Sequence, residues 1–197
     1  MPAGDSYIET EVKIAFPEGA AAARALIERA GFERFEERTL ESDQLFDRHD
    51  GELRATDRVL RLRRTGAQAI VTYKGPKSDQ EELQRYKSRE EIEFDISDAT
   101  AFEKMLERLG YVAGFRYEKY RTKFRAPGET GVLSIDETPI GVFLELEGAP
   151  AWIDRTSSRL GLPAAEYLTA SYVSLYQQYL RTHPAMSPDM TFSEGHS

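Results

Sequence analysis

The sequence of 197 residues predicts an α+β fold, in which an eight-stranded antiparallel β-barrel with a charged interior is flanked by helices. Three observations predict this fold. Eight segments alternate as strands do, turn residues join several of them as hairpins, and charged side chains recur on one face of nearly every strand. A single charged face normally meets water. Its recurrence indicates that the charged faces line the interior of a closed sheet.

The predicted strands are short and closely spaced. They cover about residues 6–16, 42–47, 57–64, 68–74, 84–96, 115–126, 131–137 and 141–147. Turn-forming residues separate several of them, at 65–66, 127–131 and 138–141. Since hairpins join antiparallel neighbours, these segments are expected to form one antiparallel sheet that can close on itself.

Helical periodicity predicts helices at about residues 18–30, 98–109, 151–160 and 164–181. Gly31 and Gly110 follow the first two, and Asp98 is a suitable N-cap for the second. Beyond Thr182 the chain is rich in Pro, Ser, Met and Gly and lacks periodicity. The sequence therefore predicts one folded domain over residues 1–182 and a disordered tail over residues 183–197.

An internal repeat relates two parts of the chain. Residues 11–16, followed by a helix that ends near Gly31, resemble residues 91–96, followed by a helix that ends near Gly110. Each unit is an acidic strand followed by a helix. The repeat predicts that the two acidic strands occupy related positions in the fold.

Composition and charge argue against several classes of function. The net charge of −8 argues against broad binding to nucleic acid or a membrane surface, which both require a basic exterior. No apolar run approaches the ~20 residues that span a bilayer, and no signal-peptide pattern is present. The absence of Cys excludes thiolate nucleophiles, disulfides and Cys-ligated zinc. A cytoplasmic protein is the expectation.

The charged strand faces contain both signs. The acidic members are Glu9, Glu11, Glu91, Glu93, Asp136, Glu145 and Glu147, and the basic members are Lys13, Arg61, Arg63, Lys74, Arg89, Lys119, Arg121 and Lys123. Burying such groups unpaired would cost several kcal/mol each, so they must be paired or solvated. For any one strand, exposure to water remains the alternative. Together they suit a metal-bound polyphosphate, because carboxylates bind hard cations and Arg and Lys bind phosphate.

The ordered motifs resemble those of the CYTH superfamily, the triphosphate tunnel metalloenzymes. Glu9-Thr-Glu11-Val-Lys13 is similar to the Glu-x-Glu-x-Lys signature of that family. Its later motifs are matched in order by residues 43–47, 60–63, 72–75, 89–93, 119–121 and 136–147. The resemblance covers roughly residues 6–180. The family includes class IV adenylate cyclases, thiamine triphosphatases and inorganic triphosphatases.

This resemblance implies a barrel that forms a tunnel for a triphosphate with Mg²⁺ or Mn²⁺. It implies a metal site at Glu9, Glu11, Glu145 and Glu147, with Asp136 as a further ligand. It implies phosphate binding by Lys13, Arg61, Arg63, Lys74 and Arg121, with Lys119 and Lys123 as further candidates. Glu91 and Glu93 are the expected catalytic pair, which would orient the bases or the attacking water.

Three functions are compatible with these residues. The first is a metal-dependent triphosphatase acting on tripolyphosphate, thiamine triphosphate or ATP. The second is a class IV adenylate cyclase that converts ATP to cyclic AMP and pyrophosphate. The third is a polyphosphate-binding module without turnover. No nucleic-acid or membrane partner is expected, and a homodimer is left open.

Four tyrosines in the predicted last helix have helical spacing: Tyr167, Tyr172, Tyr176 and Tyr179. Core packing is the simpler interpretation of this spacing. The alternative is a helix that closes one mouth of the tunnel and brings a tyrosine, or Arg181, to the substrate.

Overall fold

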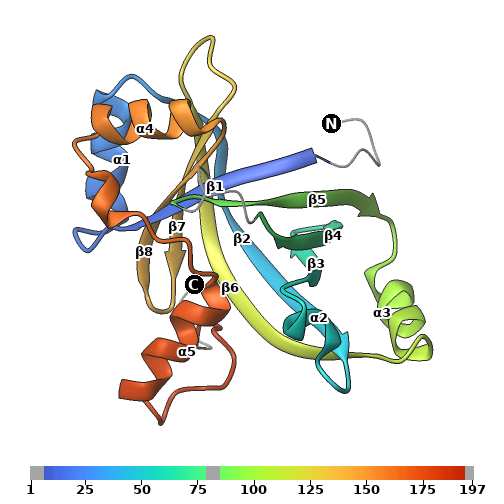
Figure 1. The fold of residues 1–197 in the computed structure, drawn as a ribbon. Coiled ribbons are helices and arrows are strands. Elements are labelled where there is room, and N and C mark those ends of the chain that lie inside the picture. Colours follow the sequence, from blue (N-terminus) through green and yellow to red (C-terminus); the bar gives the residue numbers. More distant parts are fainter. Residues whose placement is uncertain (1–6, 79–84, 194–197) are drawn as a thin grey trace.

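The computed structural model describes residues 7–78 and 85–193, and confirms the predicted fold class. Eight antiparallel strands form a closed barrel in the order β1-β5-β4-β3-β2-β6-β7-β8 (Figure 1). Their bounds are Tyr7–Ala15 (β1), Glu33–Arg48 (β2), Val59–Thr65 (β3), Gln68–Lys77 (β4), Lys87–Ile96 (β5), Tyr111–Arg125 (β6), Val132–Thr138 (β7) and Gly141–Glu147 (β8). Residue 84, the first residue of the strand predicted over 84–96, lies outside the described residues, and β5 begins at Lys87.

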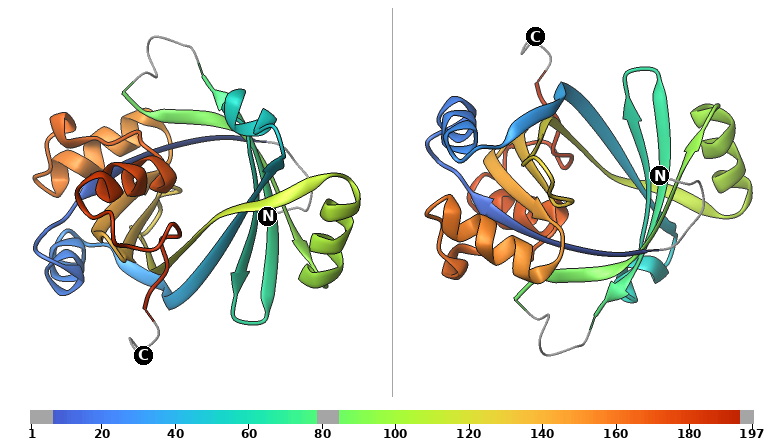
Figure 2. Two further views of the ribbon diagram at one scale, coloured as in Figure 1. Left: turned by 90° about the horizontal axis from the view of Figure 1, so that it is seen from below. Right: turned by 90° about the horizontal axis from the view of Figure 1, so that it is seen from above.

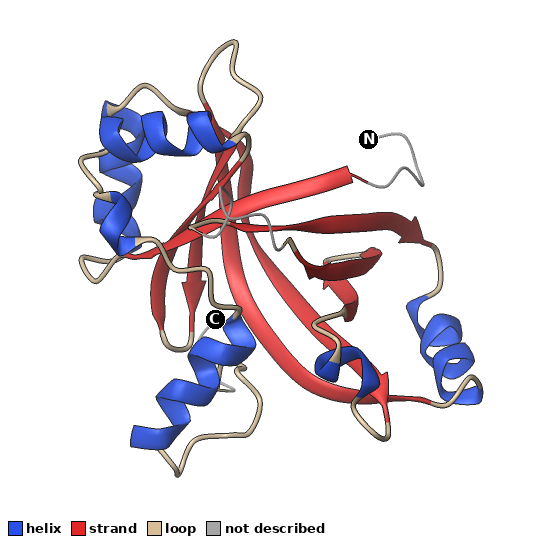
Figure 3. Cartoon of the chain, in the orientation of Figure 1, coloured by secondary structure: helices blue, strands red, loops and turns tan. Residues whose placement is uncertain are grey.

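The helices lie outside the barrel (Figure 3). They are Ala20–Arg29 (α1), Glu52–Ala55 (α2), Ala99–Arg108 (α3), Pro150–Arg159 (α4) and Tyr172–Thr182 (α5), with a 3₁₀ turn at Ala164–Glu166. Both views of Figure 2 place α3 on the side of the barrel opposite α1 and α4. In the described residues no helix is long and apolar enough to cross a membrane.

The apolar core lies between the barrel wall and these helices. Outward-facing Val12, Ile14 and Leu144 pack with Ile27 of α1 and Ile153 of α4, all of them fully buried. A second cluster joins α3 to β2, β3 and β4, and a third joins α5 to β6 and β8. In the first two clusters the apolar side chains of the strands point outward to the helices, so strand alternation directs the charged ones inward. Tyr117 and Phe143 of the third cluster share the inner strand faces with Lys119 and Glu145, so α5 packs against the edge of the interior.

The short helix α2 was not predicted, and two predicted elements differ most in their bounds. β2 begins at Glu33 rather than near residue 42, because it pairs with the whole length of β6. Residues 33–40 are exposed, so no burial pattern marks them as a strand in the sequence. The predicted helix over residues 164–181 is interrupted where Leu168 exchanges two backbone hydrogen bonds with Lys13. α5 begins afterwards, with Ser171 as its N-cap.

The internal repeat corresponds to neighbouring parts of the barrel. β1 and β5 pair side by side, and a helix follows each of them along the chain. The acidic pairs of the two strands therefore face the same interior.

The segment after α5 follows the barrel wall, although composition predicted disorder from residue 183. Met190 is fully buried, its backbone exchanges hydrogen bonds with Arg116 and Glu118, and Phe192 packs on Tyr120. A few anchoring side chains hold this segment, and such isolated anchors leave no periodic signal in a sequence. Residues 194–197 lie outside the described residues.

Candidate functional site

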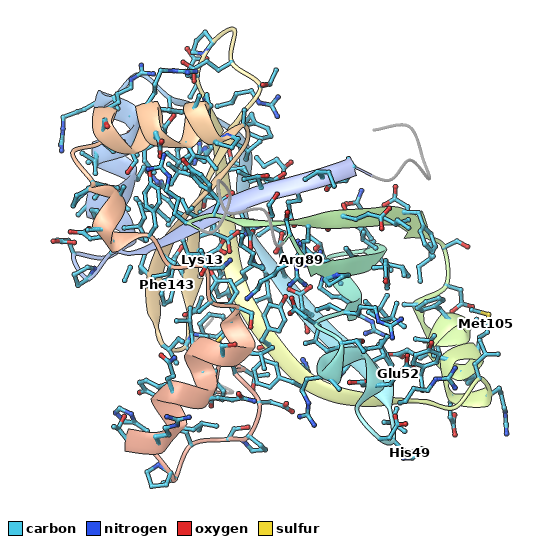
Figure 4. All side chains as sticks on the ribbon, in the orientation of Figure 1. Lys13, His49, Glu52, Arg89, Met105 and Phe143 are labelled. Carbon is cyan, nitrogen blue, oxygen red and sulfur yellow. The ribbon has the colours of Figure 1, made fainter. Side chains whose placement is uncertain are left out.

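The charged strand faces point into the barrel and are buried there. Figure 4 labels Lys13 on β1 and Arg89 on β5 in the central part of the barrel, in contrast to Met105 on the outer side of α3. The buried inward-facing groups include Glu9, Glu11, Lys13, Arg61, Arg63, Lys74, Arg89, Glu91, Lys119, Asp136 and Glu145, each at most 9 % exposed. The structure therefore brings together side chains from seven strands that the sequence could group only by alternation.

Three carboxylates form an acidic group on β1 and β8. Glu11 is opposite Glu147 in the register of these strands, and Glu9 lies two residues from Glu11 on the same face. Burial and the charge of Glu11 raise the pKa of Glu9 to about 7. Burial and the charges of Glu9 and Glu11 likewise raise the pKa of Glu147 to about 7. These carboxyls thus repel one another when all are ionised.

Lysines surround this acidic group. Lys74 of β4 contacts Glu9 and lies 2.8 Å from Glu91. Lys13 and Lys87 both donate to Oε1 of Glu11. Burial alone would raise the pKa of Glu11, but Lys13 and Lys87 hold it well below its usual range. Glu11 is therefore the ionised centre of the group.

The opposite wall carries two arginines that share Asp43 as a partner, since Oδ1 of Asp43 lies 2.9 Å from Arg63 Nε and 3.5 Å from Arg61 Nε. Arg63 donates to both oxygens of Asp43, over 2.9 and 3.1 Å, and its Nη1 lies 3.0 Å from Glu41. Arg61 donates to Thr72 over 2.9 Å, while its buried Nε makes no hydrogen bond to a described residue. Arg61 thus has a donor available for an anion, whereas Arg63 is largely engaged within the protein.

A second basic group is formed around Asp136 of β7. The two oxygens of this fully buried carboxylate accept hydrogen bonds from Lys119 Nζ at 2.9 Å, from Arg121 Nε and Nη2 at 2.6 and 2.5 Å, and from the Tyr172 hydroxyl at 2.7 Å. Glu145 lies between Lys13, at 3.1 Å, and Arg121. The structure therefore surrounds Asp136 and Glu145 with basic side chains, which occupy their carboxylate oxygens.

The predicted catalytic pair lies on β5. Glu91 is buried beside Lys74, and Glu93 accepts a hydrogen bond from Thr72 over 2.9 Å. Both approach Arg61 Nη2, at 3.9 and 3.5 Å. Their contacts with Arg61 and Lys74 suit them to orienting these bases, and the 37 % exposure of the Glu93 side chain gives it access to water.

Two predicted basic residues have partners at the edge of the site. Lys123 is 28 % exposed and pairs with Glu36 at 3.0 Å. Arg89 is buried, and its Nη2 donates to both oxygens of Asp57, a residue with a positive φ of 51°. The structure does not bring Lys123 into the buried cluster.

The sequence reasoning missed four buried groups of this interior as site residues: Glu41, Asp43, Lys87 and Tyr172. Alternation alone could have found three of them, because Lys87 is in phase with Arg89 and Glu41 is in phase with Asp43. Tyr172 belongs to a helix, so strand alternation could not find it, and the sequence named it only within the alternative that the last helix brings a tyrosine to the tunnel.

The donor set fits a hard divalent cation at the acidic group. No set of three or more acidic or histidine side chains in the described residues is gathered closely enough to enclose an ion as it stands. However, the side chain of Glu147 makes no ion pair or hydrogen bond with any described residue, although it faces Glu9 and Glu11. A cation there would relieve the mutual repulsion that raises the pKa values of Glu9 and Glu147, and carboxylate oxygens suit Mg²⁺ or Mn²⁺.

A closed antiparallel barrel lined by paired acids and bases thus defines the class of protein. Residues 7–156 match the CYTH domain family. A Methanocaldococcus jannaschii protein, named as a putative adenylate cyclase, is 33 % identical over 141 residues, which span 71 % of this chain and 76 % of that protein. The chain belongs to the CYTH family.

Solved structures share the fold. The PH1819 protein of Pyrococcus horikoshii OT3 matches with a TM-score of 0.71 and 24 % identity, over 87 % of this chain and 99 % of that one. The HpAC1 protein of Hippeastrum matches with a TM-score of 0.62 and 20 % identity, over 87 % and 96 %. The latter is described as a putative adenylyl cyclase with a dominant triphosphatase activity.

Proposed function

We propose that this protein is a metal-dependent triphosphatase that hydrolyses an inorganic or organic triphosphate in the barrel interior. The observation that carries the proposal is the acidic group of buried Glu9 and Glu11 and half-buried Glu147, beside a row of buried bases. Binding of an anion alone would require only the bases. Carboxylates that repel one another beside those bases indicate that a cation binds together with the anion.

The bases would bind the phosphate chain. Each has a carboxylate partner within the protein, as Lys13 has Glu11 and Arg121 has Asp136. Phosphate oxygens would replace some of these carboxylates as acceptors, so the bases are paired both before and after binding. Lys13, Arg61, Arg63, Lys74, Lys119 and Arg121 are the proposed phosphate ligands, and Lys87 joins them because it shares their interior.

The acidic group would hold Mg²⁺ or Mn²⁺. Glu9, Glu11 and Glu147 are the primary proposed ligands, and Glu145 and Asp136 are those that the family resemblance adds. When bound, the ion supplies positive charge that polarises the terminal phosphoryl group. Glu93, which is accessible to solvent and anchored by Thr72, would orient the attacking water, while buried Glu91 holds Lys74 in place.

Cyclisation of ATP is the second candidate function. In that reaction the ribose 3′-hydroxyl would attack the α-phosphorus and release pyrophosphate from the same interior. The name of the Methanocaldococcus jannaschii relative favours it. The description of the Hippeastrum protein favours hydrolysis on the same fold. A polyphosphate-binding module without turnover is the third candidate, and the acidic group argues against it.

One product assay separates these functions. The purified protein is incubated with tripolyphosphate, thiamine triphosphate and ATP, each with Mg²⁺ or Mn²⁺, and orthophosphate, pyrophosphate and cyclic AMP are resolved. Orthophosphate without cyclic AMP supports the triphosphatase. Cyclic AMP with pyrophosphate would replace it by the cyclase, and tight binding without products would replace it by the binding module.

A further inference from the structure

Tyr172 contacts the charged interior of the barrel, although it belongs to a helix and not to a strand. It is the first residue of α5 and is 5 % exposed. Its hydroxyl donates to Oδ2 of Asp136 over 2.7 Å, and its ring centre lies 5.2 Å from Nζ of both Lys13 and Lys119. One side chain of a peripheral helix thus touches charged groups of β1, β6 and β7.

Several contacts fix the position of this ring. Phe143 of β8 meets it edge-on at 5.6 Å, and Tyr117 of β6 lies at 6.0 Å. Ahead of the helix, the backbone of Leu168 pairs with Lys13, and Ser171 caps the first turn. In Figure 1, α5 lies at the lower end of β7 and β8. The helix is therefore anchored to the barrel on both sides of Tyr172.

We infer that Tyr172 is a positioning residue of the anion site. Its ring holds the ammonium groups of Lys13 and Lys119, and its hydroxyl holds Asp136. The inference rests on the proposed function in that the anion is taken to be a triphosphate. An aromatic face attracts a cation through its quadrupole and carries no net charge. It therefore orients both lysines without neutralising them, as a carboxylate in that place would do.

The hydroxyl has a separate effect. Asp136 carries one negative charge, whereas two positively charged side chains, Lys119 and Arg121, donate hydrogen bonds to it. The neutral Tyr172 hydroxyl donates to one lone pair of Oδ2, so that lone pair no longer accepts a hydrogen bond from Lys119 or Arg121. Without that donor, Asp136 would compete more strongly with an incoming phosphate for Lys119 and Arg121.

Tyr176 provides a matched control one turn later in the same helix. It is 1 % exposed, and its hydroxyl donates to the backbone oxygen of Ser187 over 2.7 Å. Its ring packs on Phe115 and Tyr179 and contacts no charged group of the interior in the described residues. Tyr176→Phe therefore removes an equivalent hydrogen bond from the helix without touching the anion site.

The test is the affinity of the full chain for tripolyphosphate, measured by calorimetry with Mg²⁺ and again with EDTA. Tyr172→Phe is expected to weaken binding about 10-fold, which is the usual scale of one hydrogen bond to a charged group. Tyr172→Leu removes the ring as well and should weaken binding further. Tyr176→Phe should bind within about twofold of the unaltered protein, while both Phe variants lower the melting temperature to a similar extent.

Each outcome decides between the inference and the proposed function. Equal affinities of Tyr172→Phe and Tyr176→Phe would overturn the inference and leave the triphosphatase standing. Selective loss in Tyr172→Phe, in a protein that does not hydrolyse tripolyphosphate, would support the inference and overturn hydrolysis. If Tyr172→Leu fails to fold, Tyr172→Phe decides alone. A native protein that binds no tripolyphosphate under either condition would overturn both.

Discussion

Arg63 donates hydrogen bonds to both carboxylate oxygens of Asp43, from Nε over 2.9 Å and from Nη2 over 3.1 Å. Asp43 is fully buried and Arg63 is 9 % exposed. This pair joins β2 and β3 inside the barrel, with Glu41 as a further acceptor for Arg63. Its stabilising effect depends on both partners, because a buried charge without its partner is costly.

Asp43→Ala should therefore destabilise the protein by about 3–5 kcal/mol, since it leaves the Arg63 guanidinium short of a buried partner. The measurement is the free energy of unfolding in urea. Arg64→Ala is the control, because Arg64 points outward, is 39 % exposed and has Glu103 as its ion-pair partner among the described residues. Its cost should stay within about 1 kcal/mol. A similar small cost for Asp43→Ala would show that this pair does not stabilise the barrel.

Glu9→Gln and Glu147→Gln should each abolish metal-dependent turnover while leaving the fold intact. Each change removes the charge of a proposed metal ligand, keeps the side-chain shape and relieves repulsion within the acidic group. Turnover of tripolyphosphate with Mg²⁺ and circular dichroism are the measurements. Glu137→Gln is the control, because Glu137 pairs with exposed Arg38 on the outer face. Activity close to normal in both Glu9→Gln and Glu147→Gln would rule out the metal assignment.

Stability without metal should fall as the pH rises towards neutrality. Glu9 and Glu147 have their pKa values raised from 4.5 to about 7, so each binds its proton more tightly in the folded than in the unfolded protein. Their contribution is complete below about pH 4.5 and is lost as the pH rises through 7. Because each raises the pKa of the other, the loss is on the order of 3 kcal/mol for the pair.

The melting temperature in EDTA at pH 5 and at pH 8 measures this effect, with the doubly substituted Glu9→Gln, Glu147→Gln protein as the reference. Relative to the unaltered protein, the variant should have a higher melting temperature at pH 8 than at pH 5. The lowered pKa values of Glu11 and Glu145 act below pH 4.5, and that of Lys87, lowered by burial to about 8, acts above pH 8. A difference that is independent of pH would contradict the repulsion described for the acidic group.

Arg61→Ala should weaken substrate binding about 10- to 100-fold, because the buried Nε of Arg61 makes no hydrogen bond to a described residue and has only a 3.5 Å ion pair with Asp43. KM for tripolyphosphate should rise more than kcat falls. Arg64→Ala should leave KM within about twofold, since Arg64 belongs to the opposite face of the same strand and is partly exposed. Equal effects of the two substitutions would exclude Arg61 as a phosphate ligand.

Met190→Ala should destabilise the protein by about 2–4 kcal/mol, because Met190, in the segment that follows α5, is fully buried. Met186 lies in the same segment and is 42 % exposed, so Met186→Ala should change stability by less than about 0.5 kcal/mol. Chemical unfolding of the two variants provides the comparison. Equal, small effects would show that the segment does not contribute to the fold.

Much of the barrel could be predicted because alternation is a local property of a strand. Glu9, Glu11 and Lys13 had to share a face, and the recurrence of such faces required a closed interior. The same rule could have added Lys87 and Glu41. It could not find the first half of β2, where both faces meet solvent and no pattern marks the strand.

The sequence by itself determined which side chains point into the barrel and which family the chain resembles, since both follow from residue order. Only the tertiary structure decided which charges meet. Asp136 shares its face with the other proposed metal ligands in the sequence pattern, yet barrel closure places it against Lys119, Arg121 and Tyr172. Such partners come from strands and a helix far apart in the chain, and their meeting depends on register and on where α5 docks, which no local pattern encodes.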